Sequence, residues 1–308
     1  MSVVDIDAPR TDASQVIIEV HAAGVTFPDV LLTRGEYQMK PGLPFVPGSE
    51  VAGVVKSAPT GSPFTAGQRV AAFCGFGGFA EQVAVPPHVV FPLSERHSFA
   101  QGAALPMNVL TVHFGLTRRG RLRSGETVLV HGAAGGIGTA AIQLACAMGA
   151  RVIAVVSSPD KEDVAKSAGA HDVVAATGFR EAVSKLTKGR GVDVIVDPVG
   201  GDRFTDSLRS LATEGRLLVI GFTGGEIPTV KVNRLLLNNV EVIGVGWGAF
   251  WMARPHYLQE QWAELGPHLA SGALDPIIGA TYSLDRASEA LRELSDRKVR
   301  GKVILAVR

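Results

Sequence analysis

A glycine-rich turn between a strand-like run and a helix-like run constrains this chain more than any other feature. Residues 127–130 are apolar and partly β-branched, and residues 139–148 are rich in alanine, with Gly149 placed to end a helix. A strand, a glycine turn and a helix in this order open a parallel sheet, and the glycines let a pyrophosphate approach backbone amides at the helix N-terminus. The turn therefore predicts dinucleotide binding, with Ala133 in place of the first glycine of the common GxGxxG pattern. It reads His131-Gly132-Ala133-Ala134-Gly135-Gly136-Ile137-Gly138.

Alternating strand-like and helix-like segments follow the turn. Six strands separated by helical patterns predict an α/β fold with a doubly wound Rossmann sheet. The further apolar runs lie at residues 152–156, 172–175, 192–196, 217–220 and 240–245.

The two ends of the chain have a different pattern. Short strand-like runs at residues 16–20, 51–55, 69–73 and 81–85 are broken by proline, glycine and turn residues, which predicts a mostly-β region. A last strand is expected at residues 302–307, after a helical stretch at 287–297. We expect this last strand to return to the amino-terminal region.

Composition and charge exclude several classes of function. Thirty basic and 29 acidic residues in 308 give a formal charge of +1, so the chain lacks the positive field that non-specific nucleic-acid binding needs. No run approaches the roughly 20 apolar residues that cross a bilayer, and the amino end lacks a signal-peptide pattern. We expect a cytoplasmic protein with no nucleic-acid or membrane partner. Cys74 and Cys146 are too few for a disulfide framework and are interpreted as packing residues.

The end of the second predicted strand favours NADP over NAD. An enzyme specific for NAD usually places an acidic residue there to hold the two ribose hydroxyls. This chain has Ser157, Ser158 and, after Pro159 and Asp160, Lys161. Hydroxyls and an ammonium suit a 2′-phosphate, which a carboxylate would repel. Asp160 opposes this interpretation, and the alternative for Lys161 is a solvated charge in the first turn of the next helix.

Ligands for a catalytic zinc are missing at the expected positions. Dehydrogenases with a two-part layout often hold zinc with Cys and His, and this chain has Thr26, Phe27 and Ser49 where such enzymes carry them. The eight histidines show no paired spacing, so His113 and His131 are interpreted as packing or hydrogen-bonding residues. The sequence predicts no metal site.

Five segments of the chain, in this order, carry a family resemblance. They are AGVTFPDVLLTRGEY (23–37), PFVPGSEVAGVV (44–55), ALPMNVLTVHFGL (104–116), VLVHGAAGGIGTAAIQLA (128–145) and GFTGGEIP (221–228). Together they resemble the zinc-free, zeta-crystallin-like quinone oxidoreductase branch of the medium-chain dehydrogenase/reductase family. The resemblance implies a GroES-like, mostly-β catalytic domain from residues 1–103 and 268–308, an inserted Rossmann domain that binds NADPH at residues 104–267, and usually a homodimer.

The resemblance also implies which residues contact NADPH. The pyrophosphate is expected at the glycine turn, and the 2′-phosphate at the end of the second strand. The other contacts are expected before the sheet and after its fifth and sixth strands. The complete set is Asn108, Thr111, Gly135, Gly136, Ile137, Gly138, Ser157, Ser158, Lys161, Gly221, Phe222, Thr223, Gly246 and Trp247.

The chain departs from the family pattern in three places. Thr26 replaces the Asn of the family's AGVNF segment, and Ala176 or Thr177 replaces a Tyr that often covers the adenine side. The chain also starts about fifteen or more residues after its relatives do, without their usual first strand. Either the domain is trimmed or the start codon is misplaced, and we expect a partner subunit or a reorganised amino end to cover the edge that this strand would protect.

Hydrogen-bond donors must polarise the substrate if no zinc is present. In the family, the segment that holds Tyr37 faces the cleft between the domains, so we expect Tyr37 first and Thr26 second to orient the substrate oxygen. Tyr37 is equally well explained as a wall of the pocket without a proton role. Trp247 and Trp251 either line the substrate cleft or lie at a dimer edge where two sixth strands pair.

Two carboxylates and two cations near these segments have structural interpretations. Asp29 and Glu50 could form a carboxylate pair for acid/base catalysis, but we favour structural roles. Asp29 follows Pro28 at a predicted turn or helix start, where a cap is the common role, and Glu50 is expected to brace the loop around the cofactor. Arg300 and Lys302 either touch a phosphate or cap the last helix, and we interpret both as solvated.

Three functions remain open from the sequence. The first is an NADPH:quinone oxidoreductase, and the second is an NADPH-dependent reductase of the C=C bond of an enone, enal or enoyl thioester. Acceptor choice depends on pocket shape, so the motifs do not separate these two. The third is a non-catalytic dinucleotide-binding protein, which the intact glycine turn disfavours.

Overall fold

The computed structural model describes residues 2–9 and 14–308. It divides into two compact units. The first unit comprises the described residues up to 108 together with 253–270 and 275–308, and the second comprises 109–252 and 271–274. The second unit is therefore an insertion within the chain of the first. Every helix in the described part of the chain is too short or too polar to cross a bilayer.

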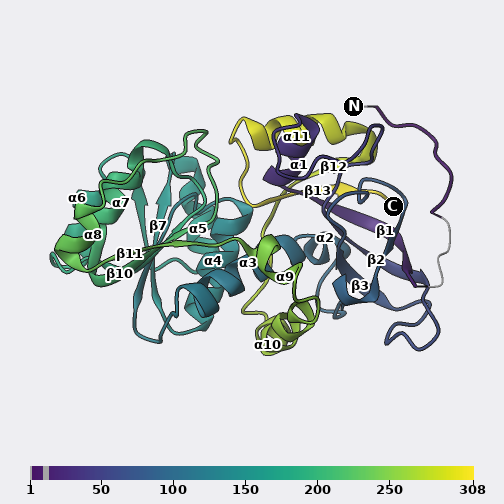
Figure 1. Cartoon of the computed structure of the whole chain (residues 1–308), viewed down its shortest axis with the longest axis horizontal. Helices are drawn as coiled ribbons and strands as arrows, with labels where there is room; N and C mark the ends of the chain where they lie inside the picture. Colours follow the sequence, from purple (N-terminus) through teal and green to yellow (C-terminus); the bar gives the residue numbers. More distant parts are fainter. Residues whose placement is uncertain (1, 10–13) are drawn as a thin grey trace. The chain divides into compact units, whose positions relative to one another are not determined.

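The first unit is built on a seven-stranded sheet within the described residues (Figure 1). The strand order is β12-β13-β1-β2-β3-β5, and β4 pairs with β1 outside this path. The strands are β1 (Val16–Val25), β2 (Glu50–Ser57), β3 (Arg69–Phe73), β4 (Gln82–Val85), β5 (Val90–Pro92), β12 (Ile278–Ser283) and β13 (Lys302–Ala306).

Strand β1 organises this sheet because it pairs with three others. Its first part lies antiparallel to β4, its last part lies antiparallel to β13, and β2 runs along its other edge. Ala23 lies opposite Leu305, so the prediction that the carboxyl end returns to the amino-terminal region is confirmed. The mostly-β prediction is also confirmed. Strand β12, which runs parallel to β13, is an additional strand that the apolar runs did not indicate, since every second residue of it is exposed.

Short helices cover the first unit. Helix α1 contacts α11, and α2 contacts β1 and β2. Helix α10 is fixed to β5, because Gln259 Nε2 donates to the carbonyls of His88 and Val90, and the Trp262 ring stacks on Phe91 with centroids 4.6 Å apart. The helical elements are α1 (Phe27–Thr33), η1 (Pro87–Val89), α2 (Phe99–Gly102), α3 (Pro106–His113), which continues into the second unit, α10 (Tyr257–Ser271), η5 (Leu284–Arg286) and α11 (Ala287–Ser295).

The second unit contains a six-stranded sheet in the order β11-β10-β9-β6-β7-β8 (Figure 1). Every neighbouring pair is parallel. The chain leaves β6 for β7 and β8, then returns to place β9 on the other side of β6, which is the doubly wound Rossmann order. The predicted fold class is therefore confirmed. The strands are β6 (Thr127–Val130), β7 (Arg151–Val156), β8 (Asp172–Ala175), β9 (Val192–Asp197), β10 (Leu211–Val219) and β11 (Glu241–Gly244).

Helices bury both faces of the parallel sheet. Phe179 of α6 and Leu208 of α7 pack against Leu129, Ile195 and Leu217 of the strands. Helix α4 contacts β6 and β7, and the central strands β6 and β9 are almost wholly buried, as strands covered on both faces must be. The helical elements are η2, a π-helical turn (Phe114–Arg119), α4 (Gly136–Ala147), η3 (Pro159–Lys161), α5 (Glu162–Ser167), α6 (Phe179–Leu186), η4 (Gly201–Arg203), α7 (Phe204–Ser210), α8 (Asn233–Asn238) and α9 (Trp247–Trp251).

Candidate functional site

The predicted glycine turn links the end of β6 to the start of α4. Gly132 has a φ of +58°, and the N–H of Gly135 donates to its carbonyl at 2.9 Å, which closes the turn. A Cβ on Gly138 would lie 2.2 Å from the Gly132 carbonyl oxygen, so only glycine lets the helix come this close to the turn. Gly135 is the N-cap of α4 and supplies no side-chain cap. The first turn of a 12-residue helix is thus left open to an anion, as a pyrophosphate requires.

The candidate 2′-phosphate residues follow β7, the strand next to β6. Lys161 Nζ donates to Ser157 Oγ at 3.1 Å, and Ser158 is the N-cap of the short helix η3 between them. Ser157 and Asp160 are exposed, whereas Ser158 and Lys161 are partly buried. The structure therefore brings the ammonium and one hydroxyl of the predicted set into contact at the carboxyl end of β7.

Two further groups of predicted residues lie after β10 and β11. The Thr223 N–H and Oγ1 both donate to the Pro198 carbonyl at 3.1 Å, which ties the loop after β10 to the loop after β9. Gly246 is the N-cap of α9, and Trp247 is buried within it. Gly221 and Phe222 are partly buried in the loop after β10. These groups follow the carboxyl ends of parallel strands, where ligands of open α/β sheets bind.

Sequence reasoning missed Asp197, the last residue of β9. Its Oδ1 accepts the N–H groups of Val199 and Gly200, each at 2.9 Å, and the residue is 1% exposed. Burial raises the pKa of this carboxyl, and the two backbone bonds oppose the rise. Because β9 and β6 flank the point where the strand order reverses, Asp197 shapes the loop beside the glycine turn. A signal was present, since an acidic residue ends the apolar run that begins at Val192.

Asn108 and Thr111 lie three residues apart on α3 and are both nearly buried. Asn108 Nδ2 donates at 3.4 Å to the carbonyl of Ala104, which lies in the turn just before the helix. Asn108 belongs to the first unit and Thr111 to the second, so the helix carries one predicted residue in each.

Thr26 and Asp29 form a capping box at the start of α1. Asp29 Oδ2 accepts the Thr26 N–H at 2.8 Å and the Thr26 hydroxyl at 2.6 Å, and the Asp29 N–H donates to Thr26 Oγ1 at 3.3 Å. The Thr26 hydroxyl also lies 3.0 Å from Ser49 Oγ. The expected capping role of Asp29 is confirmed. Thr26, Asp29 and Ser49 thus bond to one another.

Tyr37, the other predicted substrate residue, lies four residues after the end of α1 and is partly buried. Burial raises the pKa of its hydroxyl, and the charge of Asp29 raises it further. Tyr37 therefore lies within the electrostatic reach of the capping box and keeps its proton at neutral pH. Its role in catalysis, like that of Thr26, stays a prediction.

The interpretation of Lys302 as a solvated charge is wrong. It is 5% exposed in β13, and its ammonium donates to Glu50 Oε1 at 2.5 Å. Glu50 is fully buried, and its Oε2 accepts the Met107 N–H at 2.7 Å. The error arose because charged neighbours in sequence suggest solvent, whereas the partner of Lys302 is 252 positions away. Glu50 thus braces the start of α3 and pairs with the last strand.

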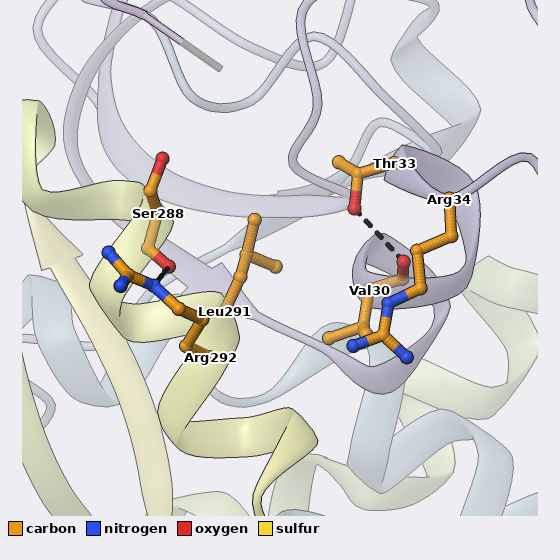
Figure 2. Close-up of a pocket in the computed structure, with 6 residues that line it drawn as sticks. All are labelled: Val30, Thr33, Arg34, Ser288, Leu291 and Arg292. Carbon is orange, nitrogen blue, oxygen red and sulfur yellow. Dashed lines mark hydrogen bonds between the residues drawn. The ribbon is translucent and has the colours of Figure 1, made fainter.

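A shallow pocket in the first unit lies between α1 and α11. Its lining residues are Val30, Thr33, Arg34, Ser288, Leu291 and Arg292, none of which was predicted as a site residue. Figure 2 shows the guanidinium groups of Arg34 and Arg292 on opposite sides of Leu291. The Arg292 Nε donates to the carbonyl of Ser288, in its own helix. The two cations therefore do not converge on a ligand, and we assign no function to this pocket.

Comparison with known proteins identifies the family. Residues 12–95 match the family model of the alcohol dehydrogenase GroES-like domain, and residues 136–270 match that of the zinc-binding dehydrogenases. A quinone oxidoreductase-like protein 2 from Bos taurus is 37% identical, over 99% of this chain and 89% of the relative. The chain belongs to the medium-chain dehydrogenase/reductase family. Within that family it lies in the zeta-crystallin-like quinone oxidoreductase branch, so the resemblance stated from the motifs is confirmed.

Solved structures of this dehydrogenase/reductase family share the fold over almost the whole chain. A probable oxidoreductase from Mycobacterium abscessus is 48% identical with a TM-score of 0.90, over 99% of this chain and 93% of that one. The quinone oxidoreductase of Thermus thermophilus, described together with its NADPH complex, is 36% identical with a TM-score of 0.85, over 99% and 95%. The CurK enoyl reductase is 26% identical with a TM-score of 0.88, over 98% and 94%.

The zinc positions of the wider dehydrogenase/reductase family contain no metal-ligand cluster here. Within residues 2–9 and 14–308, no three His, Cys, Asp or Glu side chains are grouped so that they could hold a metal ion. Cys74, beside the capping box, donates its thiol proton to the Gly48 carbonyl at 3.3 Å. Burial raises the pKa of this thiol, and the nearby charges of Asp29 and Glu50 raise it further. Cys74 therefore stays protonated at neutral pH.

Proposed function

We propose that this protein is an NADPH-dependent reductase that transfers a hydride to a quinone or a related electron-poor acceptor without zinc. The observation that carries the proposal is the contact of Lys161 with Ser157 at the end of β7, beside the glycine turn at the end of β6. A cation and hydroxyls there suit the 2′-phosphate that distinguishes NADPH from NADH. The NADPH complex of the Thermus relative supports the cofactor, and the names of the relatives support the acceptor class.

The residues divide the task of binding between them. Bound NADPH supplies the hydride, and the chain must orient the nicotinamide and the acceptor oxygen. The glycine turn holds the pyrophosphate, and the residues after β7 hold the 2′-phosphate. We propose that Tyr37 and Thr26 orient the acceptor oxygen. The remaining dinucleotide contacts are assigned to Asn108, Thr111, Gly221, Phe222, Thr223, Gly246 and Trp247.

Oxidation of NADPH and NADH with a set of acceptors tests this function. The acceptors are 1,4-benzoquinone, 9,10-phenanthrenequinone and a simple enone, each with and without a chelator. We expect the quinones to be reduced with NADPH, NADH to be much poorer, and the chelator to have no effect. Sensitivity to the chelator would contradict the zinc-free mechanism, and no turnover with any acceptor despite NADPH binding would favour a non-catalytic binding protein.

Replacing Lys161 tests the cofactor preference separately. We expect Lys161→Ala to raise the KM for NADPH about tenfold, the loss of one charge-assisted hydrogen bond, and to leave the KM for NADH unchanged. Lys166→Ala is the matched control, because Lys166 also follows β7 but lies in the last turn of α5, where it donates to Glu162 at 3.1 Å. Equal effects of Lys161→Ala on both cofactors would show that Lys161 does not contact the 2′-phosphate.

Reduction of a C=C bond is the second candidate function. The observation that favours it is the structural likeness to the CurK enoyl reductase. Both reactions begin with the same hydride transfer and differ in the atom that accepts it. Turnover of the enone alone in the acceptor set would select this function.

We also propose a homodimer in which β11 of two copies pair. Strand β11 is at the end of the sheet order, and three of its four residues are exposed. Leu236 and Leu237 of the preceding helix α8 are 75% and 76% exposed. An unpaired edge beside exposed apolar side chains favours association. A mass of 32.3 kDa in analytical ultracentrifugation, equal to one chain, would contradict the homodimer.

The cytoplasmic location stays a prediction.

A further inference from the structure

Asp29 has one oxygen that the capping box uses and one that it does not. Oδ2 accepts the Thr26 N–H, the Thr26 hydroxyl and, at 3.4 Å, the Ser49 hydroxyl. Oδ1 is buried and has no hydrogen-bond partner among the described residues. Asp29 as a whole is 0% exposed. A helix cap needs one acceptor oxygen, so capping alone does not explain a carboxyl with a second oxygen buried in this way.

Burial makes the charged form of this carboxyl costly. It raises the pKa of Asp29 to about 6, because loss of solvent outweighs the hydrogen bonds from Thr26 and the charge of Lys302, which lower it, while Glu50 raises it. Tyr37 and Cys74 are the other titratable groups that respond to the Asp29 charge, and burial and that charge raise the pKa of both, so both stay neutral. Of Asp29, Tyr37 and Cys74, Asp29 is the group whose pKa lies closest to neutral pH.

The Thr26 hydroxyl is placed to carry that proton. A hydroxyl has one hydrogen to donate and two lone pairs that accept. When Asp29 is ionised, the hydrogen of Thr26 points to Asp29 Oδ2. When Asp29 is protonated, the carboxylic acid donates across the same 2.6 Å contact, and the hydrogen of Thr26 turns to a second acceptor, either Ser49 Oγ at 3.0 Å or the oxygen of a bound substrate. The direction of the hydrogen bond reverses without movement of the heavy atoms.

We propose that Asp29 supplies, through the Thr26 hydroxyl, the proton that the reduced acceptor takes up. This inference rests on the proposed reductase function and deepens it. Thr26 is the residue that contacts the acceptor oxygen, and Asp29 acts through it as a positioning residue and proton source.

The step balances in electrons and protons. The hydride brings two electrons from the reduced nicotinamide to the acceptor, which leaves an oxyanion on a quinone. The O–H bond of Thr26 breaks as its proton joins this oxyanion, and the O–H bond of Asp29 breaks as its proton replaces the one that Thr26 lost. Asp29 ends as a carboxylate, and solvent returns its proton before the next turnover.

The pH dependence of kcat tests the inference in the full-length protein. For the wild type, we expect kcat with a quinone to fall as the pH rises through about 6, because the protonated form of Asp29 is the active one. Asp29→Asn keeps the size and an acceptor oxygen for Thr26 but has no acidic proton. We expect it to lose this pH dependence and to have a kcat about 100-fold lower, a typical contribution of a general acid.

A series of 1,4-benzoquinones whose hydroquinones differ in acidity separates proton supply from a structural effect. We expect the ratio of wild-type to Asp29→Asn kcat to grow as the hydroquinone becomes less acidic, since a more basic oxyanion depends more on the donor. If Asp29→Asn only disturbed the structure, it would lower kcat by the same factor for every acceptor. Thr26→Ser is expected to keep the wild-type profile, and Thr26→Val to behave like Asp29→Asn. Thermal unfolding and NADPH binding of each variant show whether it is folded.

The outcomes distinguish this inference from the function on which it rests. No turnover of any acceptor by the wild type would overturn the proposed reductase function. Wild-type turnover with the same pH profile and the same acceptor dependence in folded Asp29→Asn would overturn the inference alone. A wild-type profile in Thr26→Val with a changed profile in Asp29→Asn would also overturn it, because the proton would not pass through Thr26.

Discussion

Replacing Gly138 with alanine is expected to unfold the second unit at a lower temperature and to abolish NADPH binding with it. The new Cβ would lie 2.2 Å from the Gly132 carbonyl oxygen and 2.6 Å from Ala133 Cα, both of which are backbone atoms. The helix and the turn cannot both stay in place, because neither neighbour is a side chain that can rotate away. We expect a loss of about 3 kcal/mol in the free energy of unfolding, near the upper end for overpacking. Thermal unfolding followed by circular dichroism measures it.

Gly135→Ala is the matched control for this variant. Its Cβ would meet the Gly132 carbonyl oxygen at 3.4 Å, which is an ordinary contact, and Gly135 has a φ of −89° that alanine adopts freely. We expect this variant to keep the wild-type unfolding temperature and to bind NADPH at least about tenfold more weakly, because the added methyl group would reduce the space at the turn to which we assign the pyrophosphate. Normal NADPH binding by Gly135→Ala would contradict the assignment of the turn.

The second large effect is expected from Lys302→Met in the first unit. This substitution leaves the Glu50 carboxyl 0% exposed and without its cationic partner, with the Met107 N–H as its remaining hydrogen bond. Removing one member of a buried ion pair costs about 3–5 kcal/mol, most of it the penalty for the charge that stays behind. We expect a loss of this size in denaturant unfolding of the intact protein.

Two further variants define the origin of that loss. Glu50→Gln with Lys302→Met removes both charges and leaves an oxygen for the Met107 N–H, so we expect it to recover much of the stability. Lys298→Met removes an exposed lysine whose partner is Asp296 at 3.1 Å, and such surface pairs contribute at most about 1 kcal/mol. If Lys302→Met cost no more than Lys298→Met, the buried pair would not stabilise the sheet.

The sequence was sufficient for features that depend on local pattern. The six parallel strands, the glycine turn and the short β runs could be predicted because their burial and turn patterns are visible in neighbouring residues.

Strand β10 shows the limit of prediction from local pattern. Residues 217–220 were apolar enough to predict it, but the strand begins at Leu211, before an irregularity where Glu214 has a φ of +62° and pairing with β9 shifts. The early segment is stabilised by its partner strand and not by its own pattern.

The candidate site was predictable where its residues follow strands, and not where it depends on distant partners. The segment that contains Ser157 and Lys161 was recognisable because the position after the second strand has a defined task in this fold. The pairing of Glu50 with Lys302 could not be predicted, because Glu50 lies in β2 and Lys302 lies in β13, far apart in the sequence. Likewise, the sequence indicated that Asp29 caps a helix. It did not indicate that Asp29 Oδ1 is buried without a hydrogen-bond partner, because that depends on how α1 packs.

The position of β13 beside β1 bears on the order in which the chain can fold during synthesis. Residues 109–252 form most of the second unit and are continuous, so they can fold as soon as they leave the ribosome. Strand β1 is made before the second unit but waits for Lys302–Ala306, which are made after it, to complete its edge. Until then β1 exposes unpaired backbone groups to other nascent chains. We therefore expect the first unit to need chaperone protection during translation more than the unit inserted within it.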